Sequence, residues 1–201
     1  YVKKGLYCLL MWAPTAGATL EWFKKNFCEK DDYAKLNELA EKVPKGSEGL
    51  ICIPHLCGTV MPENNPKVKG VFFGATLKHN KGHFVRAIME SIAYTIKEYA
   101  DYISADISEI RSMGGGAKSD LWCRIKAEVL DKKVITLKQN ETACLGSAIF
   151  AGLGAGIYTD TATTTERIVE KSKEFIPTEN GYEKLYSDYK DKEKKLTEIY
   201  Q

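Results

Sequence analysis

Several stretches of the chain repeat apolar residues at steps of three and four, which is the pattern of helices with one buried face. The clearest stretch is residues 82–104, whose opposite edge is polar. Its apolar face carries Phe84, Ile88, Ile92, Ile96 and Tyr99. The same spacing predicts helices over residues 15–28, 32–43, 119–130 and 177–200. In the last of these, the tyrosines are expected to bury their rings and keep their hydroxyl groups in water.

Shorter apolar runs predict strands between these helices. Buried or short strands are expected over residues 5–14, 49–56, 107–113 and 133–138, and residues 71–77 fit a short strand or a turn. Residues 57–70 carry turn-forming residues and predict an exposed loop, whereas residues 140–158 predict a helix of small residues. From residue 83 onwards the order is helix, strand, helix, strand, helix, which favours an α/β layered fold.

Length and composition fit an ordinary globular protein. The 201 residues suffice for one sizeable domain or two small ones, with a single core as the default. The 29 basic and 27 acidic side chains give a net charge of +2 and form no block typical of a nucleic-acid or membrane partner. The longest apolar runs fall short of the roughly 20 residues that cross a bilayer. We therefore expect a cytoplasmic protein without nucleic-acid or membrane partners.

The cysteines and histidines suggest no metal site. The six cysteines form no C-x-x-C pair, and His55, His79 and His83 are not spaced to complete a zinc site. Most of the cysteines lie inside apolar runs, where a reduced thiol behaves as a small apolar side chain.

Three consecutive glycines, Gly114 to Gly116, lie between a predicted strand and a predicted helix. They do not complete a Walker phosphate loop, because Ala117 precedes Lys118 where that motif requires glycine. They also fail the dinucleotide fingerprint at its third glycine, where this chain has Ser119. Two interpretations remain: a tight turn without a ligand, or a turn whose bare backbone supports a flat ligand such as a purine.

Small residues also form a stripe in the predicted helix 140–158. Ala143, Gly146, Ser147 and Ala151 recur at steps of three and four, which suits close packing against another element or, as the alternative, contact with a ligand.

Three segments taken together resemble the C-terminal half of the FGGY family of carbohydrate kinases, and within it the xylulokinases most. They are residues 55–94, "MGGGAKSDLW" at 113–122 and "ETACLGSAIFAGLGAGIY" at 141–158, in this order and spacing. The resemblance implies that residues 1–201 are the C-terminal domain of such a kinase. It also implies an α/β fold of the actin-like, ribonuclease-H-like type, in which this domain is one of two lobes.

The family uses ATP and Mg2+, so both are expected here as cofactors. By resemblance, the adenine rests on the glycine turn, which assigns Gly115, Gly116, Ala117 and Asp120 to its site. Gly17 and Glu21 match the helix start that approaches the phosphates and ribose.

The family's Asp-x-Gly-Thr phosphate loop and its catalytic aspartate have no counterpart in this sequence. The chain is therefore expected to be a fragment with no catalytic residue of its own, which is inactive alone and whose partner is the N-terminal lobe of the same enzyme. The expected reaction is phosphorylation of D-xylulose to D-xylulose 5-phosphate. Gluconate, ribulose, fuculose and glycerol stay open as substrates, because Gly58 to Pro62 depart from the xylulokinase pattern Gly-Glu-Arg-x-Pro.

Two other functions stay open at this point: a non-catalytic actin-like module and, third, a Rossmann dehydrogenase. A homodimer is possible through the tyrosine-rich C-terminal helix, although packing of that helix on its own domain is the simpler expectation.

Overall fold

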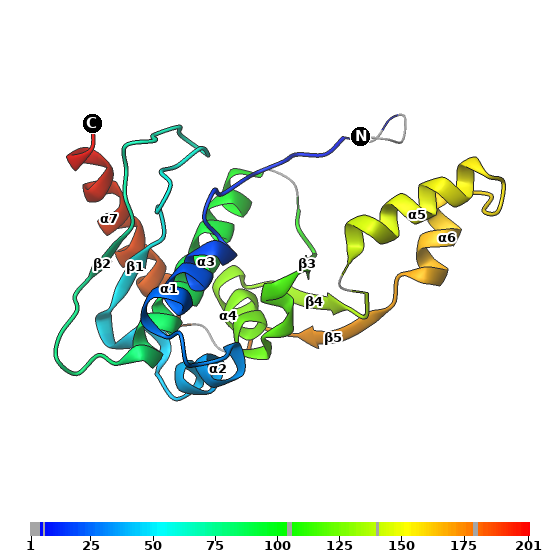
Figure 1. Ribbon diagram of the computed structural model, residues 1–201. Coiled ribbons are helices and arrows are strands. Elements are labelled where there is room, and N and C mark those ends of the chain that lie inside the picture. Colours follow the sequence, from blue (N-terminus) through cyan, green and yellow to red (C-terminus); the bar gives the residue numbers. More distant parts are fainter. Residues whose placement is uncertain (1–4, 6, 104–105, 140, 179–180) are drawn as a thin grey trace. The chain divides into compact units, whose positions relative to one another are not determined.

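The structure is a computed structural model that describes residues 5, 7–103, 106–139, 141–178 and 181–201. The described residues form two compact units, where the chain length had favoured one core. Residues up to 103 and from 182 onwards make the first unit, and residues 106–181 make the second. Figure 1 labels their helices and strands.

The first unit is mainly helical. Its elements are α1 (Gly17–Phe27), α2 (Tyr33–Glu41), the short 3-10 helix η1 (Lys45–Gly49), β1 (Ile51–Ile53), β2 (Val71–Phe73), α3 (Lys81–Tyr102) and α7 (Glu183–Ile199). Strands β1 and β2 pair antiparallel, with Cys52 opposite Phe72. Helix α3 packs against α1, α2, β1 and α7, so it is the centre of this unit. These helices and strands confirm the predicted ones, with shorter bounds for most of them.

The polar edge predicted for α3 is buried as well. Glu90 is 2% exposed and Arg86 is 7% exposed, and the Arg86 Nε donates to Glu90 Oε1 at 2.9 Å. The same carboxylate accepts hydrogen bonds from the Gly46 backbone N–H at 3.0 Å and from the Tyr182 hydroxyl at 3.0 Å. This network joins α3 to the turn after α2 and to the residue that precedes α7, and we call it the Arg86–Glu90 network.

The tyrosines of the C-terminal segment pack inside their own unit. The ring centroid of Tyr94 on α3 lies 6.1 Å from that of Tyr182, 5.8 Å from that of Tyr186 and 5.1 Å from that of Tyr189. Contrary to expectation, two of the hydroxyl groups are taken up by buried partners: the Tyr182 hydroxyl donates to Glu90, and the Tyr189 hydroxyl donates to Glu193 at 3.2 Å. A buried hydroxyl needs such a partner, because water cannot supply one there.

Two predictions for the N-terminal part are wrong. Residues 7–13 form no strand, and the side chains of Tyr7, Leu9 and Leu10 are 97%, 65% and 77% exposed. An apolar run becomes a buried strand only where a neighbouring strand pairs with it, and none of the described residues does so. The spacing of Leu20, Phe23 and Phe27 predicts one buried stripe on α1, but Phe27 is 59% exposed, since the buried face ends at Phe23.

The second unit is an α/β layer around a three-stranded sheet. Its elements are β3 (Glu109–Ser112), the short 3-10 helix η2 (Gly115–Lys118), α4 (Asp120–Leu130), β4 (Lys133–Leu137), α5 (Thr142–Gly154), α6 (Thr161–Ile168) and β5 (Lys171–Phe175). Strand β4 is central, parallel to β3 and antiparallel to β5. Cys123 and Ala127 of α4 pack on Val134 of β4, which fixes α4 against the sheet.

Helix α6 and strand β5 were not predicted. The sequence of β5, Lys-Ser-Lys-Glu-Phe, is exposed over its first four residues and lacks an apolar alternation. Helix α6 is rich in threonine, which has low helix propensity. The helix begins after Asp160, whose carboxylate accepts hydrogen bonds from the backbone N–H groups of Ala162 and Thr163.

The small-residue stripe of α5 does not pack closely on another element of the described chain. Ala143, Ser147 and Ala151 are exposed and Gly146 is half-buried. The close approach occurs instead at Gly152, where a β-carbon would lie 2.4 Å from the Tyr158 ring. The prediction of a helix is confirmed over Thr142–Gly154 and fails for residues 155–158, while Asn140, with which the predicted segment begins, lies outside the described residues.

No helix among the described residues is long and apolar enough to cross a membrane.

Candidate functional site

The glycine turn connects β3 to α4 in the second unit, as the sequence predicts. Gly114 has φ +72° and ψ −159°, a backbone conformation that is open almost only to glycine. From there the chain makes a single turn of 3-10 helix, in which the Ala117 N–H bonds to the Gly114 carbonyl oxygen at 3.1 Å. The turn ends at Ser119, whose hydroxyl accepts from the Trp122 backbone N–H at 3.1 Å and so begins α4.

The two faces of this turn differ. A β-carbon at Gly115 would meet no atom within 4 Å, so this residue exposes bare backbone. A β-carbon at Gly116 would lie 3.3 Å from the Lys126 Nζ and 3.4 Å from the Trp122 ring, so the missing side chain of Gly116 faces the protein interior. Gly115 therefore offers the open ledge, and Gly116 allows the turn to sit close on α4.

Asp120 is the first residue of α4, and its carboxylate already forms an ion pair. Both of its carboxylate oxygens accept from the Lys173 Nζ on β5, at 2.7 and 2.9 Å. Its position in the first turn of a helix is also favourable for an acidic group. The carboxylate is therefore a surface group held in place by a lysine. Asp120 lies at the same turn as the other predicted residues Gly115, Gly116 and Ala117.

Gly17 and Glu21 belong to the first unit, so the structure groups the predicted residues as two separate sets. Gly17 is the first residue of α1, as predicted, and both residues are exposed. The side chain of the N-cap residue, Ala16, makes no capping hydrogen bond, so α1 starts without the polar cap that most helices have. Thr15, just before it, is anchored by a hydrogen bond from its hydroxyl to the Pro54 carbonyl oxygen at 2.5 Å.

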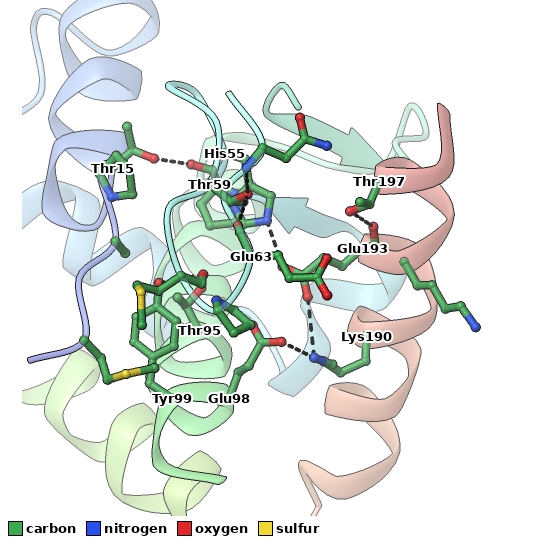
Figure 2. Close-up of a pocket in the computed structure, with 18 of the residues that line it drawn as sticks. Thr15, His55, Thr59, Glu63, Thr95, Glu98, Tyr99, Lys190, Glu193 and Thr197 are labelled. Carbon is green, nitrogen blue, oxygen red and sulfur yellow. Dashed lines mark hydrogen bonds and ion pairs between the residues drawn. The ribbon is translucent and has the colours of Figure 1, made fainter. Parts of the chain in front are cut away.

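A cavity of about 910 Å3 lies in the first unit, bordered by the segment that leads into α1. Figure 2 shows it between Thr15 on one side, Tyr99 and Glu98 of α3 below, and the residues of α7 on the other side. Its remaining wall comes from residues 54–65, and the Tyr99 hydroxyl donates to the backbone carbonyls of Trp12 at 3.2 Å and Met61 at 3.3 Å. None of the six residues predicted for the nucleotide site lines this cavity.

Two pairs of ionisable groups meet in the cavity wall. The His55 Nε2 lies 2.7 Å from the Glu193 Oε1, and the Lys190 ammonium forms an ion pair with Glu98. Burial, reinforced by nearby Glu193, raises the pKa of Glu98, and burial raises the pKa of Tyr99 to about 12. These four groups therefore already have partners inside the cavity wall.

Sequence reasoning did not foresee this cavity. His55 and Glu193 are 138 residues apart, and no local spacing relates them. Within the described ranges, no three His, Cys, Asp or Glu side chains come together in a way that could hold a metal ion.

Comparison with known proteins identifies the family. Residues 2–155 match the model of the FGGY family of carbohydrate kinases, C-terminal domain. A xylulose kinase of Bacillus subtilis (strain 168) is 30% identical over 181 residues, which cover 87% of this chain and 36% of that protein. Gluconokinases and glycerol kinases are also among the matching proteins. The chain thus spans little more than a third of the length of the relatives that it matches.

Solved structures agree on the fold. The ligand-bound xylulose kinase from Lactobacillus acidophilus superposes with a TM-score of 0.84 and 23% identity, over 94% of this chain and 39% of that one. Plasmodium falciparum glycerol kinase with ADP gives a TM-score of 0.77 and 23% identity, over 94% and 37%. The predicted α/β fold, that of the C-terminal domain of actin-like sugar kinases, is confirmed. With three quarters of its length matched by the family model, the chain belongs to the FGGY family of carbohydrate kinases.

Proposed function

We propose that this chain is the nucleotide-binding part of an ATP-dependent sugar kinase, which transfers the γ-phosphoryl group of ATP to a sugar hydroxyl. The observation that carries the proposal is the glycine turn: bare backbone at Gly115, reached through a glycine-only conformation at Gly114, in a chain of the FGGY family. The whole of residues 1–201 is assigned to this part. Beyond the matched residues, α7 supports that assignment, since Tyr182 and Tyr189 pack into the first unit.

The residues at the turn fit an adenine nucleotide. A purine is flat and can lie on backbone that has no side chain above it, and Ala117 adds only a methyl group. The free N–H groups of a turn that leads into a helix also favour an anionic ligand. Gly17 and Glu21 stay site residues predicted from the resemblance alone. Mg2+ stays a prediction from the resemblance.

D-xylulose is the sugar that we favour, because xylulose kinases are among the relatives at 30% identity. Gluconate and glycerol are the main alternatives, since kinases for both are also relatives.

We propose that the sugar pocket and the catalytic aspartate belong to an N-terminal lobe. Positioning of the two substrates then provides much of the catalysis, as in other phosphoryl transfers. A homodimer and a cytoplasmic location stay predictions.

Isothermal calorimetry with ADP tests the proposal. The 201-residue chain is expected to bind ADP at high micromolar to millimolar concentration and to phosphorylate no sugar by itself. Replacement of Gly115 by valine fills the open ledge and should weaken binding at least tenfold. Gly154→Val is the matched control, because a β-carbon there also meets no atom within 4 Å but lies at the end of α5. ADP binding by Gly154→Val should equal that of the wild type.

Three results would count against the proposal. A folded chain that gives no heat with millimolar ADP would favour a non-catalytic module of the same fold. A folded chain that binds NADH in a fluorescence titration, and not ADP, would favour a dehydrogenase. Equal ADP affinity of wild type and Gly115→Val would remove the turn from the site, even if the chain binds the nucleotide elsewhere.

A further inference from the structure

A lysine lies buried directly behind the glycine turn. Lys126 of α4 is 7% exposed, and its Nζ donates to the Ser112 Oγ at 2.9 Å, at the end of β3. The ammonium also lies 5.1 Å from the centroid of the Trp122 ring, within the range of a cation–π interaction. Among the described residues, no carboxylate comes within ion-pair distance of it, which is unusual because buried ammonium groups are normally paired with an acid.

The same ammonium lies close beneath the inner face of the turn. Its Nζ is 3.3 Å from where a β-carbon of Gly116 would lie, and the Trp122 ring is 3.4 Å from that point. The Cys123 thiol lies nearby, 3.8 Å from the carbonyl oxygens of Gly116 and Ala117. Lys126 and Trp122 therefore support Gly116 from inside, while Gly115 faces the open side.

The position of Lys126 is determined by two elements at once. The side chain begins on α4, which the core contacts of Cys123 and Ala127 fix against β4, and its head ends at Ser112 of β3. The turn runs from β3 to α4, so this one side chain connects the two ends of the turn across its inner face. Loss of the ammonium would remove that connection without touching the open face.

We propose that Lys126 is a positioning residue for the glycine turn: its ammonium, held by Ser112 and Trp122, fixes the Gly116 backbone and so maintains the ledge on which the nucleotide base rests. The second half of this inference rests on the proposed function, whereas the first half concerns the turn alone. Loss of the positive charge also makes the region less attractive to an anionic nucleotide.

The charge on Lys126 responds to pH. Burial lowers the pKa of Lys126 below its usual value of 10.5, and the neighbouring Cys123 thiol partly opposes this. Nearby titratable groups include Lys118 of the turn, and Asp120 of α4 with Lys173 of β5, which pair with each other. The ammonium therefore loses its proton at a lower pH than a lysine in water does.

The test compares the wild type with Lys126→Met, which keeps the length of the side chain and removes its charge. Lys118→Met is the matched control, because Lys118 lies in the same turn and is exposed. Amide hydrogen exchange of residues 113–118 is measured without ligand at pH 7, and the ADP dissociation constant is measured from pH 7 to pH 10. Circular dichroism establishes that both variants are folded.

Lys126→Met is expected to increase exchange of the turn about tenfold relative to the wild type and to Lys118→Met. Lys126→Met should bind ADP five- to tenfold more weakly than the wild type at pH 7. The wild type should lose affinity for ADP as the pH rises toward 10, and Lys126→Met should not show this loss. Unchanged exchange of the turn in folded Lys126→Met would overturn the inference, whether or not the chain binds ADP. If amide exchange of the turn is faster in Lys126→Met but the ADP dissociation constant and its pH dependence are those of the wild type, the second half of the inference is overturned. Absence of ADP binding by the wild type would instead refute the proposed function, and the exchange result would still decide the role of Lys126.

Discussion

Removal of Glu90 should destabilise the first unit strongly. The carboxylate is 2% exposed and accepts from the Arg86 guanidinium, the Gly46 N–H and the Tyr182 hydroxyl, all at 2.9 to 3.0 Å. In Glu90→Ala, the guanidinium of Arg86 stays buried without its counter-charge. Breaking a buried ion pair in this way costs about 3–5 kcal/mol.

The matched variant is the double replacement Arg86→Met with Glu90→Leu. It removes both charges and fills the space with apolar atoms, a change that is often close to neutral. The free energy of unfolding of the double variant should therefore lie closer to that of the wild type than to that of Glu90→Ala. The difference between the two variants separates the penalty of an unpaired charge from the loss of packing.

Urea unfolding followed by circular dichroism at 222 nm measures both variants. Hydrogen exchange of α7 gives a second readout, because Tyr182 precedes that helix and its hydroxyl belongs to the Arg86–Glu90 network. The reasoning fails if Glu90→Ala lies within about 0.5 kcal/mol of the wild type, the range of ordinary surface substitutions. It fails as well if the double variant is as unstable as the single one.

Three further predictions concern packing and titration. Gly82→Ala should destabilise the first unit by about 1–3 kcal/mol, because the added β-carbon would lie 2.6 Å from the Leu39 carbonyl oxygen. Urea unfolding measures this loss, and Gly17→Ala is the control, because an added β-carbon there meets no atom within 4 Å. Brief treatment of the native protein with iodoacetamide should modify exposed cysteines only, as read by peptide mass spectrometry. Modified sites are expected at Cys8, Cys57 and Cys144 and protected sites at Cys28, Cys52 and Cys123. Because the native pKa of Lys126 is lowered, the unfolded chain binds more protons between that pKa and 10.5, so the stability of the second unit should rise with pH in this range. Urea unfolding followed at Trp122, with the other two tryptophans replaced by phenylalanine, should show this rise in the wild type and not in Lys126→Met.

Much of the secondary structure could be predicted from local patterns, because most helices here bury one face. Helix α4 shows this well: the four-residue spacing of Leu121, Ile125 and Val129 predicts that they share one face, and all three are buried. The strand expected over residues 5–14 shows the limit of the approach. Its composition is that of a buried strand, but burial depends on a partner strand, and the composition of a segment does not reveal whether one is present.

The candidate site was predictable in part, for a related reason. The glycine turn stands out because only glycine adopts the conformation of Gly114, and that requirement is visible in the sequence. Which glycine faces outward was not visible, since it depends on the rotation of the turn relative to Trp122 and Lys126. Lys126 itself looks in the sequence like any lysine of an exposed helix edge. Its burial results from the packing of α4 on the sheet.

The exposed apolar segment before α1 also affects how the protein behaves in solution. Tyr7, Leu9, Leu10 and Trp12 carry large side chains that are more than half exposed, on backbone that joins no strand among the described residues. Such segments template intermolecular pairing. A concentrated sample of this chain should therefore form soluble oligomers and then precipitate, and replacement of Leu9 and Leu10 by lysine should keep it monodisperse in light scattering.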